Sequence, residues 1–469
     1  MASPLLNEAN EGDVAWSVLF LAADVSRWTT GTVIPVDAGM LVSAPMSVLV
    51  GRFGMTTGTS DLSGIHALLG ADPRALADPY TIYRGITEDS GVVEVDDVVL
   101  VAGYDVVRAT LRDNTNLSNR GLVEGSWIAA ARERLDGDAL EAFDEIIAFQ
   151  ANFASRTDGA DHRRIRTVAS KLFTPGNIAR LDDSARRYSA ELVTELLASD
   201  EPDGMVLAAR LPLLMMGDFL GVHRAELDAI QEWSAALGAA VSSYDGPTML
   251  AARSAQQNFV DYVDHLIERS GEDPGPTELV RVLMTAHASG QLKRPELAAM
   301  FVQLLFAGHE TTMTLLGGGL LELLRRPDQW RLLIDDPTRI PNAVDELLRF
   351  ITPSQFAARV TVEDTAVAGV TCPRGQTVLA SMAGANRDPA SFTDPERLDV
   401  CRANARNHLS FGAGPHFCLG ASLARLEAAA MLDELVRRAP DLTLLDSDPS
   451  WTGGPQLRKL VSLPLRVGR

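Results

Sequence analysis

Apolar positions along most of the chain repeat every three or four residues, which is the pattern of amphipathic helices. This repeat predicts helices near residues 139–154, 177–198, 225–241, 252–269, 277–288, 295–326, 341–350 and 419–438. Short runs rich in β-branched residues and flanked by Gly or Pro predict strands at 92–101, 360–370 and 376–381. We therefore expect a mainly α fold with a small β region.

The longest predicted helix, residues 295–326, would be about 48 Å long at 1.5 Å per residue. Pro295 suits its first turn and Pro327 its end. Apolar residues surround its middle on every side, which is typical of a helix buried in the core of a large domain. His309 and Glu310 at its centre exclude a membrane span.

Composition narrows the possible partners. The 469 residues carry 42 Lys and Arg against 62 Asp and Glu, a net charge of -20, which argues against general attraction to nucleic acid or anionic membranes. Three cysteines suit neither a disulfide framework nor a zinc site. No secretory signal is evident, because acidic residues precede the first apolar stretch. We expect a cytoplasmic monomer.

One cysteine follows a glycine-rich segment that reads FGAGPHFCLG at 411–420, directly before a predicted helix. Free N–H groups at a helix start stabilise a thiolate, so Cys418 is a candidate nucleophile or metal ligand. Gly412, Gly414 and Gly420 would leave room for a large flat ligand. A lone cysteine is more often a buried structural residue, so the sulfur alone does not decide between these possibilities.

In order and spacing, this segment resembles the haem-binding signature F-x-x-G-x-x-x-C-x-G of the cytochrome P-450 family. The resemblance implies the fold of that family, in which a long central helix crosses a haem b cofactor. It further implies that Cys418 is the thiolate ligand of the iron. Phe411, Gly412, Gly414 and Gly420 would belong to the loop that binds the cofactor.

The centre of the long helix carries an acid and hydroxyl groups in the stretch AGHETT at 307–312. A buried carboxylate is either satisfied by partners or kept for function, and the residues alone leave both possibilities open. The stretch resembles the family motif A-G-x-[D/E]-T. This implies that Ala307 and Gly308 lie against the haem, with Gly308 admitting dioxygen and water, and that Glu310 and Thr311 form a catalytic proton relay.

Other charged residues match family positions that retain the haem. Glu346 and Arg349 are three apart on one helix face and can pair, although a single pair of this kind is by default solvated. They resemble the structural E-x-x-R motif of the family, which implies a role in folding. Five residues match positions that neutralise the haem propionates through charge-assisted hydrogen bonds: His162, Arg166, Arg359, His408 and His416.

These matches run in family order from about residue 60 to 469, and they resemble the soluble bacterial type. The resemblance implies a monooxygenase that inserts one oxygen atom of O2 into an apolar small molecule, with electrons from a ferredoxin or flavodoxin and its reductase. Arginines at 163, 164, 186, 187 and 402 are expected to form the docking face. A peroxide-driven or rearranging haem-thiolate enzyme and a haem-thiolate binding protein without turnover stay open as alternatives.

The first residues have a different character. Segment 13–42 resembles the last helix and strand of short-chain dehydrogenases, a family that needs a Tyr-x-x-x-Lys pair. None of the three lysines qualifies, because Thr167, Ser289 and Pro455 stand four residues before them. We therefore expect residues 1–50 to be a non-functional leader and 51–469 to be the haem domain. Deletion of residues 1–45 is expected to leave haem content and activity unchanged.

Overall fold

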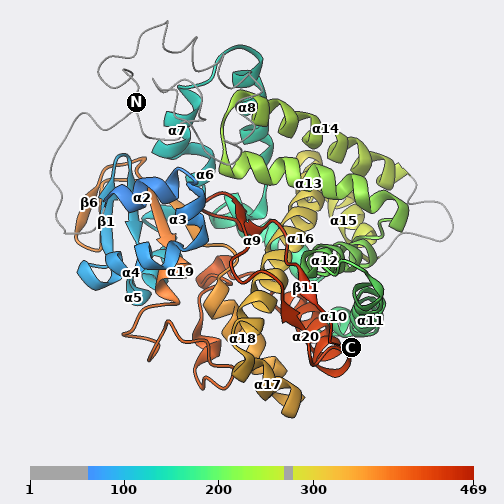
Figure 1. The fold of residues 1–469 in the computed structure, drawn as a ribbon. Coiled ribbons are helices and arrows are strands. Elements are labelled where there is room, and N and C mark those ends of the chain that lie inside the picture. The colour runs from blue at the N-terminus through green and yellow to red at the C-terminus, as the bar shows by residue number, and fades with distance from the viewer. Residues whose placement is uncertain (1–61, 269–277, 469) are drawn as a thin grey trace, which may run out of the picture. The chain divides into compact units, whose positions relative to one another are not determined.

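The computed structural model describes residues 62–268 and 278–468, so the predicted leader at 1–50 lies outside the described residues. Helices make up most of the described chain (Figure 1). The first of them are α2 (Leu62–Leu69), α3 (Pro73–Ala77), α4 (Pro79–Asp89), α5 (Tyr104–Arg112), α6 (Gly121–Glu124), α7 (Ser126–Arg132), α8 (Gly137–Gln150), α9 (Gly159–Ser170), α10 (Pro175–Arg180), α11 (Asp182–Ala198) and α12 (Gly204–Leu220). They are followed by α13 (Leu227–Ser242), α14 (Gly246–Glu268), α15 (Glu278–Ala288), α16 (Arg294–Leu324), α17 (Pro327–Asp335), α18 (Ile340–Ile351), α19 (Met382–Ala385) and α20 (Ala421–Arg438).

Most of the predicted helices are present, with two informative differences. The predicted helix at 177–198 is divided into α10 and α11 at Leu181, and Asp182 and Asp183 occupy the first turn of α11, where a negative charge is favourable. Helix α12 was not predicted, because it is buried on most of its surface and contains Pro212. Its apolar residues therefore show no one-sided repeat.

The main sheet has the strand order β1-β2-β7-β4-β3. Its strands are β1 (Val92–Val95), β2 (Val98–Val101), β3 (Leu117–Ser118), β4 (Phe356–Thr361) and β7 (Thr377–Ser381). The β2 and β7 strands are parallel, and the other neighbouring strands are antiparallel. Val99, Val101 and Val378 pack against Val107 and Leu111 of α5, which forms one hydrophobic core.

Two predicted strands are hairpins. Residues 92–101 turn at Asp96, whose φ of 51° breaks the strand. Residues 360–370 leave β4 at Thr361 and continue into the hairpin β5 (Thr365–Val367) and β6 (Val370–Cys372). Two further small sheets pair β8 (Thr443–Leu444) with β11 (Leu465–Arg466) and β9 (Trp451–Gly453) with β10 (Arg458–Leu460).

Helix α16 confirms the predicted long buried helix. Glu296 accepts a hydrogen bond from the Lys293 backbone N–H over 2.8 Å, which caps its start, and α17 begins at Pro327. Helices α12, α18 and α20 pack against α16, which runs through the middle of the helical region (Figure 1). No described helix has the length and apolar character needed to cross a membrane.

The E-x-x-R pair is fully buried, so it is not a solvated surface pair. Arg349 donates to both carboxylate oxygens of Glu346, over 2.7 and 2.8 Å. Its guanidinium also donates to the carbonyls of Asn386 and Pro395. Arg402 joins this network through Glu346 over 3.1 Å and is 8% exposed. Arg402 is therefore a buried structural residue, which corrects its predicted place on a docking face.

Asn386 carries this network to the cysteine loop. Its side-chain oxygen accepts the Leu409 N–H over 2.7 Å, and its amide donates to the Ser410 and Thr352 hydroxyls over 2.8 Å each. Leu409 and Ser410 directly precede Phe411, where the loop begins. The buried ion pair thus fixes the segment that leads to Cys418.

Candidate functional site

The cysteine loop positions its sulfur at a helix start, as the sequence predicted. The Cys418 N–H donates to the Phe411 carbonyl over 2.9 Å, which closes the loop before α20. Burial raises the pKa of the Cys418 thiol, while the N–H groups of Gly420 and Ala421 and the charge of Arg166 lower it. The Cys418 side chain nevertheless keeps an exposed surface. The thiol therefore lies deep in the protein but faces an open space.

The glycines of the loop have two different roles. Gly412 and Gly414 have φ values of 71° and 74°, which L side chains rarely adopt. A Cβ at Gly414 would also lie 3.3 Å from the backbone of Leu111 and Arg112, so this glycine allows close packing on α5. Only Gly420 borders the sulfur, because a Cβ there would lie 3.9 Å from Cys418 Sγ.

Four of the five predicted propionate residues form one basic cluster. The rings of His162 and His416 stack with centroids 3.8 Å apart. Arg166 donates to the Phe417 carbonyl over 2.5 Å. Burial lowers the pKa of Arg166, while the charge of the nearby Cys418 raises it. Burial lowers the pKa of His416, and the positive charge of Arg359 on β4 lowers it further. The strand and the cysteine loop therefore lie close together here. We call His162, Arg166, Arg359 and His416 the basic cluster.

The basic cluster has more positive groups than anionic partners. Burial, His416 and Arg166 lower the pKa of His162 to about 4. Burial lowers the pKa of Arg359 to about 10, and its Nε has no hydrogen-bond partner among the described residues. The nearby carboxylate is Asp158, whose Oδ1 lies 3.7 Å from His416 Nε2. Although burial opposes its ionisation, hydrogen bonds from His416 and other neighbours hold the pKa of Asp158 below its ordinary value.

His408, the fifth predicted propionate residue, lies beside Asp345 on α18. Its Nδ1 accepts the Ser410 N–H over 3.2 Å, and its Nε2 lies 3.4 Å from Asp345 Oδ1 on α18. Arg425 also donates to Asp345, over 2.7 Å, and lies over the ring of Phe411. The Nε2 of His408 has no hydrogen-bond partner among the described residues, although Asp345 lies near it. Through Nδ1 His408 supports the cysteine loop, and its predicted contact with a haem propionate stays a prediction.

These residues fit the haem that the sequence predicts. A haem b brings two carboxylates, which suit the buried and partly unpaired basic cluster, and an iron, which suits the Cys418 sulfur. Among the described residues, no group of three or more His, Cys, Asp or Glu side chains is arranged to hold a metal ion.

The predicted relay residues lie together on α16. Thr311 donates from Oγ1 to the Ala307 carbonyl over 2.7 Å. Glu310 is 6% exposed, and Lys459 on β10 donates to its Oε2 over 3.4 Å. Gly308 faces α12, because a Cβ there would lie 2.6 Å from Met216 Sδ on that helix. In this structure Gly308 lets two helices approach closely.

Beside Ala307 and Thr311 lies a cavity of about 260 Å³, which we call the main cavity. Seven of its fifteen lining residues are apolar or aromatic, and the other eight carry amide or hydroxyl groups or, in Arg156, a guanidinium. The lining consists of Phe149, Gln150, Phe153, Ser155, Arg156, Leu237, Gln256, Val302, Gln303, Phe306, Ala307, Thr311, Ser354, Gln456 and Leu457. A cavity of this kind suits a small organic ligand.

Sequence reasoning missed three residues of this region. Arg156 lies on the short 3₁₀ turn Ala154–Arg156, six residues before His162, and is an isolated cation in the segment NFASR. Asp158 follows it, and Lys459 is one of only three lysines in the chain. Only the rarity of lysine could have drawn attention to Lys459, because its contact with Glu310 joins residues 149 positions apart.

Comparison with known proteins finds relatives in a single family. The family model described as cytochrome P450 matches residues 339–439. The chain is 34% identical over 408 residues to the cytochrome P450 monooxygenase PikC of Streptomyces venezuelae, covering 84% of this chain and 92% of that protein. It is 32% identical to the 6-deoxyerythronolide B hydroxylase of Saccharopolyspora erythraea, covering 83% and 96%.

Solved structures agree with these relatives. The fold matches the ligand-free structure of the cytochrome P450 CYP164A2 of Mycobacterium smegmatis with a TM-score of 0.74 at 30% identity, over 87% of this chain and all of that one. The predicted long helix, the cysteine loop and the mixed sheet therefore have counterparts in experimentally determined proteins.

Proposed function

The chain belongs to the cytochrome P450 family, and from this premise we propose that it oxygenates a small molecule with an apolar body, using electrons from a separate ferredoxin or flavodoxin. As a member of the family it is a monooxygenase, an oxidoreductase that incorporates oxygen, and its cofactor is haem b. When bound, the haem supplies the iron at which dioxygen is activated.

The residues of this chain would hold the haem from two sides. The Cys418 sulfur would bind the iron, with the N–H groups of Gly420 and Ala421 stabilising its negative charge. Arg166, Arg359 and the stacked His162–His416 pair would neutralise the propionates. The buried network of Glu346 and Arg349 would keep the cysteine loop in place when the cofactor enters.

The observation that carries the proposed reaction is the position of Thr311 and Glu310 on α16. The Thr311 hydroxyl borders the main cavity and donates to the Ala307 carbonyl, so it can exchange this partner for a reacting group. Glu310, the next residue, is buried but touches the partly exposed Lys459. These positions suit a relay in which Glu310 takes up a proton from the solvent side and Thr311 delivers one beside the substrate.

The electron donor would dock on the face that holds the cysteine loop. Arg163, Arg186 and Arg187 are exposed, although Arg186 also pairs with Asp182 and Arg187 with Asp218, whereas Arg164 is half-buried against Glu296 and Arg402 is buried. Helix α11, which carries Arg186 and Arg187, packs against α20 behind Cys418. We therefore reduce the proposed docking face to these three exposed arginines. Charge reversal at all three should slow reduction at low salt and weaken its salt dependence.

Two alternatives are separated by the same measurements. A peroxide-driven enzyme would form product from hydrogen peroxide at least as fast as from dioxygen with electron carriers. A binding protein would show ligand-dependent spectra but no product. The presence of Thr311 in the lining of the cavity, with Glu310 as the preceding residue of α16, favours the dioxygen reaction.

The deciding experiment has a spectral part and a product part. The reduced protein with carbon monoxide should show the red-shifted Soret band of thiolate ligation, and Cys418→Ser should abolish it. With a surrogate ferredoxin, its reductase and a substrate panel, the protein should incorporate one atom of labelled dioxygen into product. Normal thiolate spectra without incorporation of label from any substrate would contradict the proposed reaction.

A further inference from the structure

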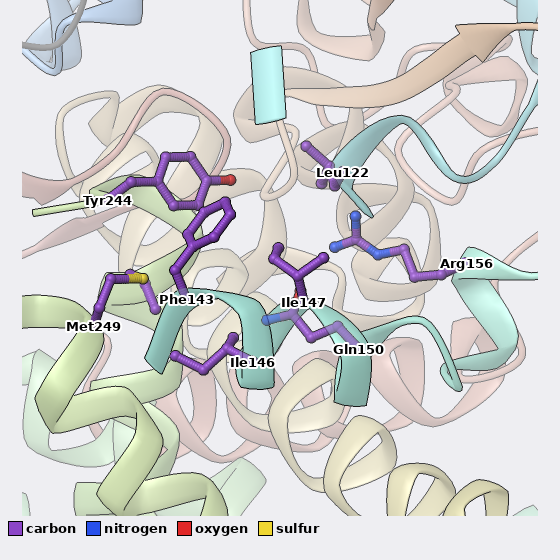
Figure 2. Close-up of a pocket in the computed structure, with 9 residues that line it drawn as sticks. Leu122, Phe143, Ile146, Ile147, Gln150, Arg156, Tyr244 and Met249 are labelled. Atoms are coloured by element: carbon purple, nitrogen blue, oxygen red, sulfur yellow. The ribbon is translucent and has the colours of Figure 1, made fainter. Parts of the chain in front are cut away.

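One guanidinium stands in the lining of the main cavity. Arg156 ends the 3₁₀ turn that leads into α9, and it borders both the main cavity and a narrow recess next to it. Leu122, Phe143, Ile147 and Tyr244 also line the recess, which has a volume of about 10 Å³, room for about one water molecule. In Figure 2 the Arg156 guanidinium and the Tyr244 hydroxyl point into this space from opposite sides.

Arg156 lacks an anionic partner in this part of the chain. Burial lowers the pKa of Arg156 to about 10, while the nearby Tyr244 hydroxyl raises it. None of the described residues that line the main cavity or the recess is Asp or Glu. Arg164, eight residues further on, shows the contrast, because it forms a two-pronged ion pair with Glu296. A half-buried cation of this kind is stabilised by an anion that enters the cavity.

The other residues that line the main cavity indicate the chemistry of the rest of such a ligand. Phe149, Phe153, Leu237 and Phe306 form apolar walls that suit a hydrocarbon or aromatic body. Gln256 also lines the cavity, and its buried Oε1 has no hydrogen-bond partner among the described residues, so it can accept a bond from a hydroxyl group. The cavity therefore combines one cation with aromatic and aliphatic walls and uncharged polar groups, and it extends to Thr311.

Haem propionates are the other anions that could reach Arg156. Arg156 lowers the pKa of Arg359, so these two guanidinium groups are close enough to repel each other. However, neither Cys418 nor any member of the basic cluster lines the described part of the main cavity or the recess. Arg156 instead shares its surroundings with α8, α13 and α14, which carry Gln150, Leu237 and Gln256. This placement favours the substrate over the propionates.

We propose that Arg156 binds the carboxylate of the substrate, which is an apolar carboxylic acid whose body extends toward Thr311. This rests on the proposed function, because it takes the main cavity as the place where the oxygenated molecule lies. A charge-assisted pair in such a site would favour an acid over its uncharged ester by about tenfold or more in affinity. The reaction itself would leave the carboxylate unchanged and alter only the body of the molecule.

The test compares matched ligands on the haem-loaded protein. Dodecanoic acid and cyclohexylbutanoic acid, each with its methyl ester, are titrated by calorimetry and by the Soret shift. The unaltered protein should bind at least one acid about tenfold more tightly than its ester. Arg156→Gln should abolish this preference, and Arg156→Lys should keep part of it. Arg331→Gln, which alters an exposed arginine on α17, should keep all of it.

Three results would overturn the inference. Equal binding of every acid and its ester by the unaltered protein would show that no carboxylate site exists. A preference that survives in Arg156→Gln would assign the carboxylate to another residue. Loss of haem from Arg156→Gln with an unchanged acid preference would make Arg156 a propionate ligand. Normal thiolate spectra and oxygenation of the esters by the unaltered protein would show that the proposed function stands while the inference fails.

Discussion

Lys459 on β10 donates to Oε2 of Glu310 on α16 over 3.4 Å, which joins the C-terminal hairpin to the centre of the long helix. Glu310 is 7% exposed at its side chain and Lys459 is 31% exposed. The ammonium group therefore stabilises a buried carboxylate and connects it with solvent. Nothing in the sequence around Glu310 indicates this contact, because β10 is far away along the chain.

Lys459→Gln should weaken the proton relay. Without the ammonium group, Glu310 loses its described lysine partner and the charge that holds its carboxylate on the solvent side. We expect several-fold less product per dioxygen consumed, with normal thiolate spectra. The ratio of product to consumed dioxygen measures this. Lys459→Arg keeps the charge and should retain most of the ratio; an unchanged ratio in Lys459→Gln would exclude Lys459 from the relay.

Arg349→Met should strongly destabilise the protein. Removal of one member of a fully buried ion pair leaves Glu346 charged without its main partner, which costs about 3–5 kcal/mol. The hydrogen bond to the Asn386 carbonyl is lost as well, so the cysteine loop should loosen. Urea unfolding and the haem retained after gel filtration measure both effects. Arg132→Met, which removes an exposed pair with Asp144, is the control and should change neither.

The sequence predicted those parts of the site that depend on local spacing. Cys418 at the start of α20 and Thr311 on α16 follow from their neighbours in the chain. The environment of His408 could not be predicted in this way, because Asp345 comes from a helix more than sixty residues earlier. Gly308 shows the same limit, since the close approach of Met216 depends on how α12 crosses α16.

In the fold as well, the features with a local sequence repeat were predicted, and those that depend on contacts between distant segments were not. The 3.6-residue repeat located helices with one buried face, but it missed α12, which is buried on most sides. Burial of the E-x-x-R pair was also beyond the sequence pattern, because three separate segments cover it. The isolated Arg156 carries no local signal of its role, since the walls of the main cavity come from α8, α13, α14 and α16.

His162 should make the haem-free protein less stable in acid. Burial lowers its pKa to about 4, whereas the unfolded chain has the ordinary value of about 6.5. Below pH 6.5 the unfolded state therefore binds a proton that the folded state does not, so the free energy of unfolding falls as the pH drops toward 4. Urea unfolding at several pH values measures this slope.

Two comparisons make the His162 prediction specific. His162→Gln should reduce the slope between pH 6.5 and 4, because glutamine does not titrate. Binding of haem should raise the pKa of His162, since two propionates would favour its charged form. Histidine NMR titrations with and without haem follow this directly. A pKa that stays near 4 when haem is bound would place the propionates away from His162.

Thr311→Ala should separate dioxygen consumption from product formation. The substitution removes the hydroxyl that borders the main cavity and its hydrogen bond to the Ala307 carbonyl, while α16 keeps its backbone bonds. Because we propose that this hydroxyl is the last proton carrier before the substrate, we expect product formation to fall by about a hundredfold while the reduced electron carrier is still consumed. The missing product should appear as hydrogen peroxide. Two control variants separate the hydroxyl group from the side-chain shape. Thr311→Ser restores a hydroxyl at the same atom position and should recover much of the product. Thr311→Val keeps the shape of threonine without its hydroxyl and should behave like Thr311→Ala. Full product formation by the valine variant would mean that the side-chain shape, and not the proton on Oγ1, is what the reaction needs at this position.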